Sequence, residues 1–337
     1  MKKDVATIVK SVTDKIIKDM EGANPTEWMK SWTNTSFQNL NGHHYTGFNV
    51  FWLSMIDGGF LGGKKKDRKI YGTFLQWKAK GLSIKKGSKA IPLLKPIIGS
   101  GTKEVETPEG VKDVKYNYKY FKTFNVFNIE DVEGDVSSWD GVDRFNAKND
   151  VEASQVAEDY VSNLKAKINH IDGGNAYYVP SQDAVFMPSK KSFIDTKDSS
   201  ATHNYYTTLF HELTHWTGDK SRCNRDLTGW KGSASYAFEE LVAELGSAFL
   251  ANQLDICVTP RADHAKYLKG WAQCLKDKPQ ALLNASGLAN KALTFMNSKQ
   301  PKANAKVVLN VKPDAVKSIK EYKIDANGKR ELVQVVV

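Results

Sequence analysis

The chain has 337 residues, a length that suggests two domains, each large enough to bury its own core. Its three cysteines have neither metal-ligand spacing nor a pairing framework, which is typical of a reducing compartment. The basic N-terminus lacks the apolar stretch of a secretory signal, and no apolar run is long enough to span a bilayer. We therefore expect a soluble cytoplasmic protein with no membrane partner.

Positive charge is confined to the first part of the chain. Residues 1–130 contain 22 Lys and Arg against 12 Asp and Glu, whereas residues 131–337 contain 26 of each, so the net charge of +10 lies entirely in the N-terminal part. A generic basic surface would explain the sign of this charge but not its segregation. The segregation predicts a polyanionic partner for residues 1–130.

The pattern of residues 1–130 predicts a small α+β domain. Residues 4–20 place apolar side chains at helical spacing, and a second helix is expected at residues 45–53 and beyond. The glycine- and lysine-rich stretch over residues 58–69 is expected to be a flexible basic loop. Residues 90–97 and 114–128 alternate as strands of a β-hairpin, joined by a polar turn over residues 99–110.

Aromatic rings are interleaved with lysines along this region. Lysines can follow the phosphates of a single strand while bases stack on aromatic rings, at about 1–3 kcal/mol per base. The region holds a single arginine, Arg68, which disfavours readout of base edges in duplex DNA. Core packing is the alternative for any single ring. On the second strand, Tyr116, Tyr118 and Tyr120 share one face, and Lys115 and Lys119 share the other. The candidate contacts to single-stranded DNA are Lys64, Lys65, Lys66, Trp77, Lys85 and Lys86.

Residues 131–149 are expected to form an acidic linker to a second domain over residues 150–300. A helix over 150–170, strands over 176–179 and 184–187, and helices over 261–276 and 280–298 are predicted for this domain. Residues 301–337 form a C-terminal extension. Asn327 and Gly328, between two alternating runs, predict a β-hairpin there.

The segment over residues 208–218 contains His211-Glu212-x-x-His215, a zinc-hydrolase signature. Two histidines four residues apart lie on one face of a helix and can bind one zinc ion through their ring nitrogens. Zinc lowers the pKa of a bound water, and Glu212 can take its proton as general base while the water attacks a carbonyl. Apolar residues surround the motif at helical spacing, so a buried catalytic helix is favoured over a histidine-rich structural one. A peptide is the default substrate of this motif.

A second helix is predicted over residues 234–250, with Glu240 and Glu244 together on its polar side. This arrangement resembles that of thermolysin-like zinc peptidases, in which a glutamate of the second helix binds zinc. The resemblance implies that Glu240 is the third metal ligand and that Glu244, one turn later, orients a ligand histidine. Glu239 lies about 100° away around the helix and is expected to be solvated or paired. The candidates for a donor to the oxyanion stay open: Tyr236, His264 and Tyr267.

Further motifs extend over residues 5–298. They include Tyr45-x-Gly-x-Asn49, Lys85-Lys86-Gly87, Tyr120-Phe-Lys-Thr-Phe-Asn-Val-Phe-Asn128, Asp183-x-x-x-Met187-Pro188 and Arg225-Asp226-Leu227. Together with the zinc motif, they resemble those of ArdC-type antirestriction proteins. The resemblance implies an N-terminal domain that binds single-stranded DNA, followed by a zincin-like metallopeptidase domain. It also implies protection of incoming plasmid or phage DNA from host restriction, and transfer of the protein with that DNA into a recipient cell. The extension beyond residue 300 departs from the family pattern.

Three functions are compatible with this pattern. The first is a metallopeptidase that its N-terminal domain brings to DNA, with restriction enzymes or other DNA-bound proteins as substrates. The second is a non-enzymatic shield for single-stranded DNA with a structural or idle zinc site. The third is a nuclease, which is disfavoured because nucleases usually assemble more carboxylates for paired metals. An intact Glu212 favours the first function, since a structural zinc site needs no general base.

Overall fold

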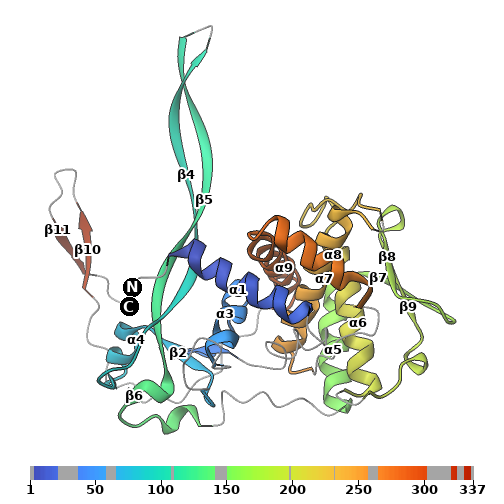
Figure 1. The fold of residues 1–337 in the computed structure, drawn as a ribbon, viewed down its shortest axis with the longest axis horizontal. Helices are drawn as coiled ribbons and strands as arrows, with labels where there is room; N and C mark the ends of the chain where they lie inside the picture. The colour runs from blue at the N-terminus through green and yellow to red at the C-terminus, as the bar shows by residue number, and fades with distance from the viewer. Residues whose placement is uncertain are drawn as a thin grey trace. The chain divides into compact units, whose positions relative to one another are not determined.

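The computed structural model describes residues 4–21, 37–57, 66–107, 110–140, 150–196, 199–230, 232–256, 265–301, 320–324 and 330–334 (Figure 1). Residues 1–300 form one compact unit and residues 301–337 form a second, smaller one. Helices and strands are mixed throughout the first unit, so the expected α+β class is confirmed. Most of the loop expected over residues 58–69 lies outside the described residues, including Lys64 and Lys65.

The N-terminal helices are α1 (Val5–Met20), α3 (Phe48–Asp57) and α4 (Phe74–Ala79). The apolar stripe predicted for α1 is buried, since Ile8, Val9 and Val12 have no exposed surface. Thr73 begins α4 with a capping box, in which its hydroxyl accepts a hydrogen bond from the backbone N–H of Gln76.

A four-stranded sheet follows, in the order β1 (Gln38–Asn39), β2 (Ile70–Gly72), β5 (Gly110–Asn128) and β4 (Ile91–Thr107). Strands β4 and β5 pair antiparallel in one unbroken register from Ile91–Val126 to Thr107–Gly110. The turn expected over residues 99–110 is therefore wrong, because most of those residues continue the two strands. Strand-favouring Thr102, Val105 and Val111 extend the ladder outward.

Part of the expected acidic linker is structured. Strand β6 (Val132–Glu133) pairs with β3 (Ser83–Ile84), and the ring of Trp139 meets that of Trp77 edge-on, with their centroids 5.7 Å apart. Residues 132–139 therefore belong to the packed structure of the N-terminal part. Short 3-10 helices are η1 (Ile129–Asp131), η2 (Ser137–Trp139), η3 (Pro180–Gln182) and η4 (Lys190–Ser192).

The following region begins with α5 (Asp150–Leu164) and a three-stranded sheet in the order β7 (Lys167–Ile171), β9 (Ala184–Pro188) and β8 (Tyr177–Val179). The helix expected over 150–170 ends earlier because Lys165 has a left-handed backbone, with φ of 56°, from which the chain enters β7. Four further helices follow in the described part of the region: α6 (Ala201–Trp216), α7 (Ala234–Gln253), α8 (Ala265–Asp277) and α9 (Ala281–Ser298).

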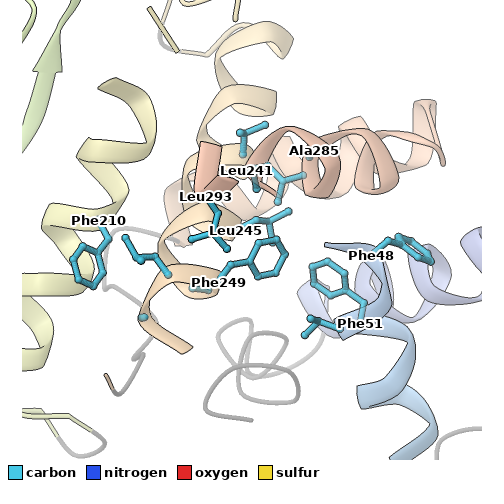
Figure 2. Close-up of a cluster of buried hydrophobic side chains, with 14 of the residues drawn as sticks. Phe48, Phe51, Phe210, Leu241, Leu245, Phe249, Ala285 and Leu293 are labelled. Atoms are coloured by element: carbon cyan, nitrogen blue, oxygen red, sulfur yellow. The ribbon is translucent and has the colours of Figure 1, made fainter. Parts of the chain in front are cut away.

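The larger of two hydrophobic clusters among the described residues includes side chains from both sides of the expected linker, and the smaller one surrounds Trp77 in the N-terminal part. Figure 2 shows Phe48 and Phe51 of α3 beside the cluster around Phe249 of α7; the ring centroids of Phe51 and Phe249 are 6.4 Å apart. Helix α1 also contacts the segment that follows α8, where the Thr13 hydroxyl donates to the carbonyl of Pro279 at 3.0 Å. The N-terminal helices therefore share their apolar faces with the helices of the second region.

In the smaller unit, β10 (Lys320–Ile324) pairs antiparallel with β11 (Arg330–Gln334). The turn residues Asn327 and Gly328 lie outside the described residues. Among the helices that the structure describes, none combines the length and apolar character needed to cross a membrane.

Candidate metal centre

The candidate site lies where helices α6 and α7 approach each other closely. A Cβ added to Gly246 of α7 would lie 2.5 Å from the side chain of Thr214 on α6, so only glycine allows this approach. Nearer the N-terminus of α6, the carbonyl of Thr207 accepts a hydrogen bond from the Ser247 hydroxyl at 2.7 Å. These contacts place the carboxylates in the first half of α7 against the histidines of α6.

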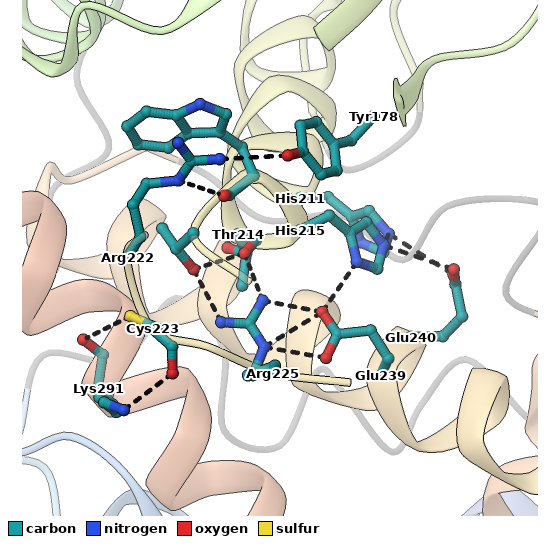
Figure 3. Close-up of polar contacts among 12 residues, drawn as sticks. Tyr178, His211, Thr214, His215, Arg222, Cys223, Arg225, Glu239, Glu240 and Lys291 are labelled. Atoms are coloured by element: carbon teal, nitrogen blue, oxygen red, sulfur yellow. Dashed lines mark hydrogen bonds and ion pairs between the residues drawn. The ribbon is translucent and has the colours of Figure 1, made fainter. Parts of the chain in front are cut away.

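His211, His215 and Glu240 converge at this contact (Figure 3). Nε2 of His211 lies 3.2 Å from Nε2 of His215. The two oxygens of the Glu240 carboxylate lie 3.6 Å from Nε2 of His211 and 3.4 Å from Nε2 of His215. His211 and Glu240 are buried and His215 is nearly so. The structure thus brings together the three ligands that the sequence motif and the resemblance implied.

The other ring nitrogen of each histidine faces a second carboxylate. Nδ1 of His211 lies 3.2 Å from Oε2 of Glu244, as expected for a residue that orients the ring. Nδ1 of His215 lies 3.1 Å from Oε1 of Glu239. When each Nδ1–H points at a carboxylate, both Nε2 atoms keep their lone pairs toward the shared point.

Glu239 is the residue whose role the sequence did not reveal. It is buried rather than solvated, and its pairing involves both His215 and Arg225. The guanidinium of Arg225 holds it with Nε 2.9 Å from Oε2 and Nη2 2.8 Å from Oε1. Arg225 also donates to the Thr214 carbonyl and the Thr217 hydroxyl, so it ties the loop after α6 to both helices. In the sequence, the motif Arg225-Asp226-Leu227 is the feature that could have indicated a role for Arg225 near the site.

The carboxylates control the charge of the cluster. Burial disfavours a charged imidazole, but the hydrogen bonds that His215 donates to Glu239 and Glu240 outweigh it and raise the pKa of His215 from 6.5 to about 10. Burial would raise the pKa of Glu240, yet its bonds to His211 and His215 lower it well below the ordinary value. Burial acts the same way on Glu239, whose pKa is lowered by His215 and Arg225. The ionised carboxylates therefore favour a positive charge at the ring nitrogens, carried by a proton or by a metal ion.

The spacing of the donor atoms fits a divalent metal. Bonds of about 2.0–2.1 Å to zinc separate the ligand atoms of a tetrahedral site by about 3.3 Å. The distances of 3.2, 3.4 and 3.6 Å among the two Nε2 atoms and the Glu240 oxygens are close to that value. Two ring nitrogens at 3.2 Å must have either a proton or a metal ion between them, because two facing lone pairs would repel. Two imidazoles and one carboxylate also form a donor set that is common in catalytic zinc sites.

Glu212 is buried on α6 next to His211, with 4% of its surface exposed. Among the candidate oxyanion donors, Tyr236 is half-buried in the first turn of α7. His264 and the side chain of Tyr267 lie outside the described part of the chain.

The structure separates the candidate DNA contacts into two groups. Trp77 is fully buried, and its Nε1–H donates to the carbonyl of Phe127 at 3.2 Å, so its ring supports the core and has no face for a base. Nζ of Lys66 lies 2.7 Å from Asp131 Oδ1, which compensates its charge internally. Lys85 and Lys86 are exposed; the ammonium of Lys85 also donates to the Glu130 carbonyl.

Comparisons with known proteins agree with both halves of the chain. Residues 6–127 match the N-terminal domain of the anti-restriction factor ArdC, and residues 155–288 match the zincin-like metallopeptidase family MPTase-PolyVal. The metal-free crystal structure of the antirestriction ArdC protein from the R388 plasmid is 30% identical, with a TM-score of 0.62, and covers 86% of this chain and 97% of that one. A Mn(II)-bound structure of that protein superposes with a TM-score of 0.60 at 27% identity, over 88% of this chain and 98% of that one.

Two relatives are similar along most of the chain. The uncharacterized protein y4eC of Sinorhizobium fredii (strain NBRC 101917 / NGR234) is 28% identical over 305 residues, which are 88% of this chain and 93% of the relative. The DNA primase TraC of Escherichia coli is 28% identical over 313 residues, which are 85% of this chain. The chain spans only 26% of the length of TraC. The resemblance that the sequence motifs indicated is confirmed by these matches.

Proposed function

Because the chain belongs to the ArdC family of antirestriction proteins, we propose that it binds single-stranded DNA and cleaves a DNA-bound protein at a zinc-dependent metallopeptidase site. It would thereby protect incoming plasmid or phage DNA from host restriction, with a restriction enzyme as the substrate. It acts in the cytoplasm and enters a recipient cell with the transferred DNA. The observation that carries the proposal is the convergence of His211, His215 and Glu240 on one point, with the buried Glu212 on the same helix as the two histidines.

Zinc is the proposed metal, held by Nε2 of His211, Nε2 of His215 and the Glu240 carboxylate. When bound, zinc would supply a Lewis acid for a peptide carbonyl and for an attacking water. The solved relative contains Mn(II), so both metals belong in a test of this site.

The residues around this point have separate tasks in the proposed reaction. In this proposal Glu212, which is buried on the same helix as His211 and His215, accepts the proton of the attacking water and returns it to the leaving amine. Glu244 and Glu239 keep the two rings oriented throughout. Strand β8 is at the edge of its sheet, where an extended substrate can add as a further strand.

The proposed partner of the N-terminal part is single-stranded DNA. Support comes from the net charge of +10 that residues 1–130 carry, the match to ArdC N-terminal domains, and the exposed Lys85 and Lys86. Lys64 and Lys65 remain proposed contacts. The second candidate function is a shield that coats single strands without chemistry. The buried general base Glu212 favours the peptidase over this shield.

Glu212→Gln separates the two functions because it removes the base and keeps the shape of the side chain. We expect this variant to bind one zinc per chain and single-stranded DNA like the wild type, which metal analysis and DNA titration check. It should fail to protect unmodified DNA transferred into a restricting host. Full protection by this variant would instead support the shield. The companion variant His211→Ala should lose both zinc and protection.

A further inference from the structure

Three tyrosines form an exposed row on the hairpin of β4 and β5. Tyr116, Tyr118 and Tyr120 alternate along β5 and are 42%, 40% and 53% exposed. Their ring centroids follow one another at 6.2 and 6.0 Å, and the second pair is stacked. Figure 1 shows β4 and β5 extending as a two-stranded ribbon beyond the short strand β2 of their sheet. Large rings at such exposure contribute little to a core and need another explanation.

Glycines on β4 make room for this row. Gly99 pairs with Tyr118, and Gly101 pairs with Tyr116. A Cβ on Gly99 would lie 2.5 Å from the phenol end of Tyr118, and one on Gly101 would lie 3.0 Å from the ring of Tyr116. The two rings therefore lie across the neighbouring strand, which holds them in place and leaves their outer sides open.

The two faces of the hairpin differ in the charged side chains that they carry. We call the face that carries the three rings the tyrosine face. The unbroken register also places four exposed lysines on this face. Lys95 and Lys122 form a cross-strand pair nearer the base of the hairpin than the rings, and Lys103 and Lys112 lie nearer its turn. The opposite face carries charges of both signs: Lys115 lies there together with Glu104 and Asp113, which are cross-strand neighbours. Among the residues of the hairpin whose side chains are described, the tyrosine face carries no carboxylate.

We propose that the tyrosine face is a binding site for a single-stranded nucleic acid, whose bases stack on the three rings while its phosphates pair with the flanking lysines. This inference rests on the proposed function and assigns it a place on the molecule. Rings about 6 Å apart require bases that are separated beyond the spacing of about 3.4 Å in a duplex, so a single strand fits and a duplex does not. Positive charge without carboxylates suits a polyanion rather than a protein surface of mixed charge.

The test measures affinity of the full chain for three probes: oligothymidylate, an abasic deoxyribose-phosphate chain of the same length, and polyglutamate of matched charge. Replacing Tyr116, Tyr118 and Tyr120 together with Leu should weaken oligothymidylate binding about 100-fold and leave binding of the abasic chain unchanged. The same three positions changed to Phe should keep the affinity. Tyr177→Leu is the matched control, because Tyr177 is 44% exposed on the separate strand β8.

Two further variants test the geometry and the charge. Gly99→Val should displace the ring of Tyr118 and weaken oligothymidylate binding about tenfold without removing any aromatic group. Each Lys→Gln change on the tyrosine face should reduce the magnitude of the slope of log affinity against log salt concentration by about 0.7. Lys115→Gln, on the opposite face of the same strand, should leave that slope unchanged.

The outcomes distinguish this site from the proposed function. If the Leu variant binds oligothymidylate like the wild type, the tyrosine face is overturned as the site while binding of single strands stands. If the wild type binds no oligothymidylate, the proposed function itself fails. Equal affinity of the wild type for polyglutamate and oligothymidylate would overturn base stacking and indicate an acidic protein partner instead.

Discussion

Each histidine of the candidate metal centre has a carboxylate against the ring nitrogen that points away from Glu240. Glu244 faces His211 and Glu239 faces His215, and Arg225 holds Glu239 from its other side. Buried carboxylates of this kind increase the basicity of a ligand histidine and fix its tautomer. In the proposed site, one glutamate of α7 is a metal ligand and two others orient the ligand histidines.

Removing these carboxylates one at a time should reveal the difference. Glu240→Ala should abolish stoichiometric zinc binding, because it removes a donor atom. Glu244→Ala and Glu239→Ala should each weaken zinc affinity by about 10–100-fold while the ion still binds. Competition with a chelator of known affinity provides the measurement. Zinc binding that survives Glu240→Ala and is abolished by Glu244→Ala would mean that Glu244 is the ligand.

The pH dependence of metal binding should follow from the charge on His215. Its pKa is raised to about 10, so at neutral pH the metal-free protein holds a proton that the metal must displace. Zinc affinity should therefore rise with pH from about 7 and level off near 10, by up to about tenfold per unit for one proton. The stability of the metal-free protein should change with pH in the opposite direction. Charged His215 stabilises the fold fully below pH 6.5, and this stabilisation is lost as the pH rises through about 10. Isothermal titration in buffers of different ionisation enthalpy counts the released protons, and a count of zero at about pH 7 would contradict this assignment.

The contact between α6 and α7 positions all the carboxylates at once. Thr214 and Gly246 meet where the helices come closest, and Thr214 also donates its hydroxyl to the Phe210 carbonyl within α6. A residue larger than glycine at position 246 must either push the helices apart or move Thr214. Because the histidines lie on α6 and the glutamates on α7, any such separation changes the distances between ligands.

Gly246→Ala tests this contact. The added methyl group should destabilise the protein by about 1–3 kcal/mol through overpacking and should weaken zinc affinity as well. Gly287→Ala on α9 is the matched control, since a Cβ there meets nothing within 4 Å. It should be neutral or stabilise the helix by up to about 1 kcal/mol. Denaturant unfolding and chelator competition measure the two effects. A Gly246→Ala variant that behaves like the control would show that the helices tolerate separation.

Residues 1–300 combine the proposed DNA-binding part and the metal centre in one packed unit. Apolar residues of α1 and α3 belong to the same core as those of α7, α8 and α9, as the contact between Phe51 and Phe249 illustrates. A fragment that ended near Val132 would expose these apolar faces to water. The two proposed functions therefore occupy different surfaces but depend on a common fold.

Metal binding should consequently stabilise the N-terminal helices. Zinc at about 100 times its dissociation constant adds about 2.7 kcal/mol of stability to the folded state, and this gain should reach α1 and α3 as well as α6 and α7. Hydrogen–deuterium exchange should slow in all four helices when zinc is added. The strands β10 and β11 belong to the separate unit and act as an internal control that should not change. Slower exchange confined to α6 and α7 would show that the two parts unfold independently.

The part of the site that is predictable from the sequence depends on local geometry. Histidines four residues apart lie on one face of any helix, and Glu240 and Glu244 have the same relation on the next helix. Alternation in β5 likewise places the three tyrosines on one face, because successive side chains of any strand point to opposite sides. The uneven distribution of charge and the motifs that carry the family resemblance can also be identified from the sequence alone.

Other assignments depended on which segments meet in three dimensions. Trp77 beside lysines has the pattern of a DNA contact, yet Trp139 from 62 positions later covers it and the ring is buried. The position of Glu239 on its own helix predicts only that it is solvated or paired; its partners His215 and Arg225 cannot be predicted because they come from α6 and the loop that follows. The sequence predicts a shorter hairpin than β4 and β5 form, since the extended pairing depends on cross-strand contacts. Helical and strand periodicity is set within a few residues, whereas burial and the pairing of charges are set by long-range packing, which no local pattern contains.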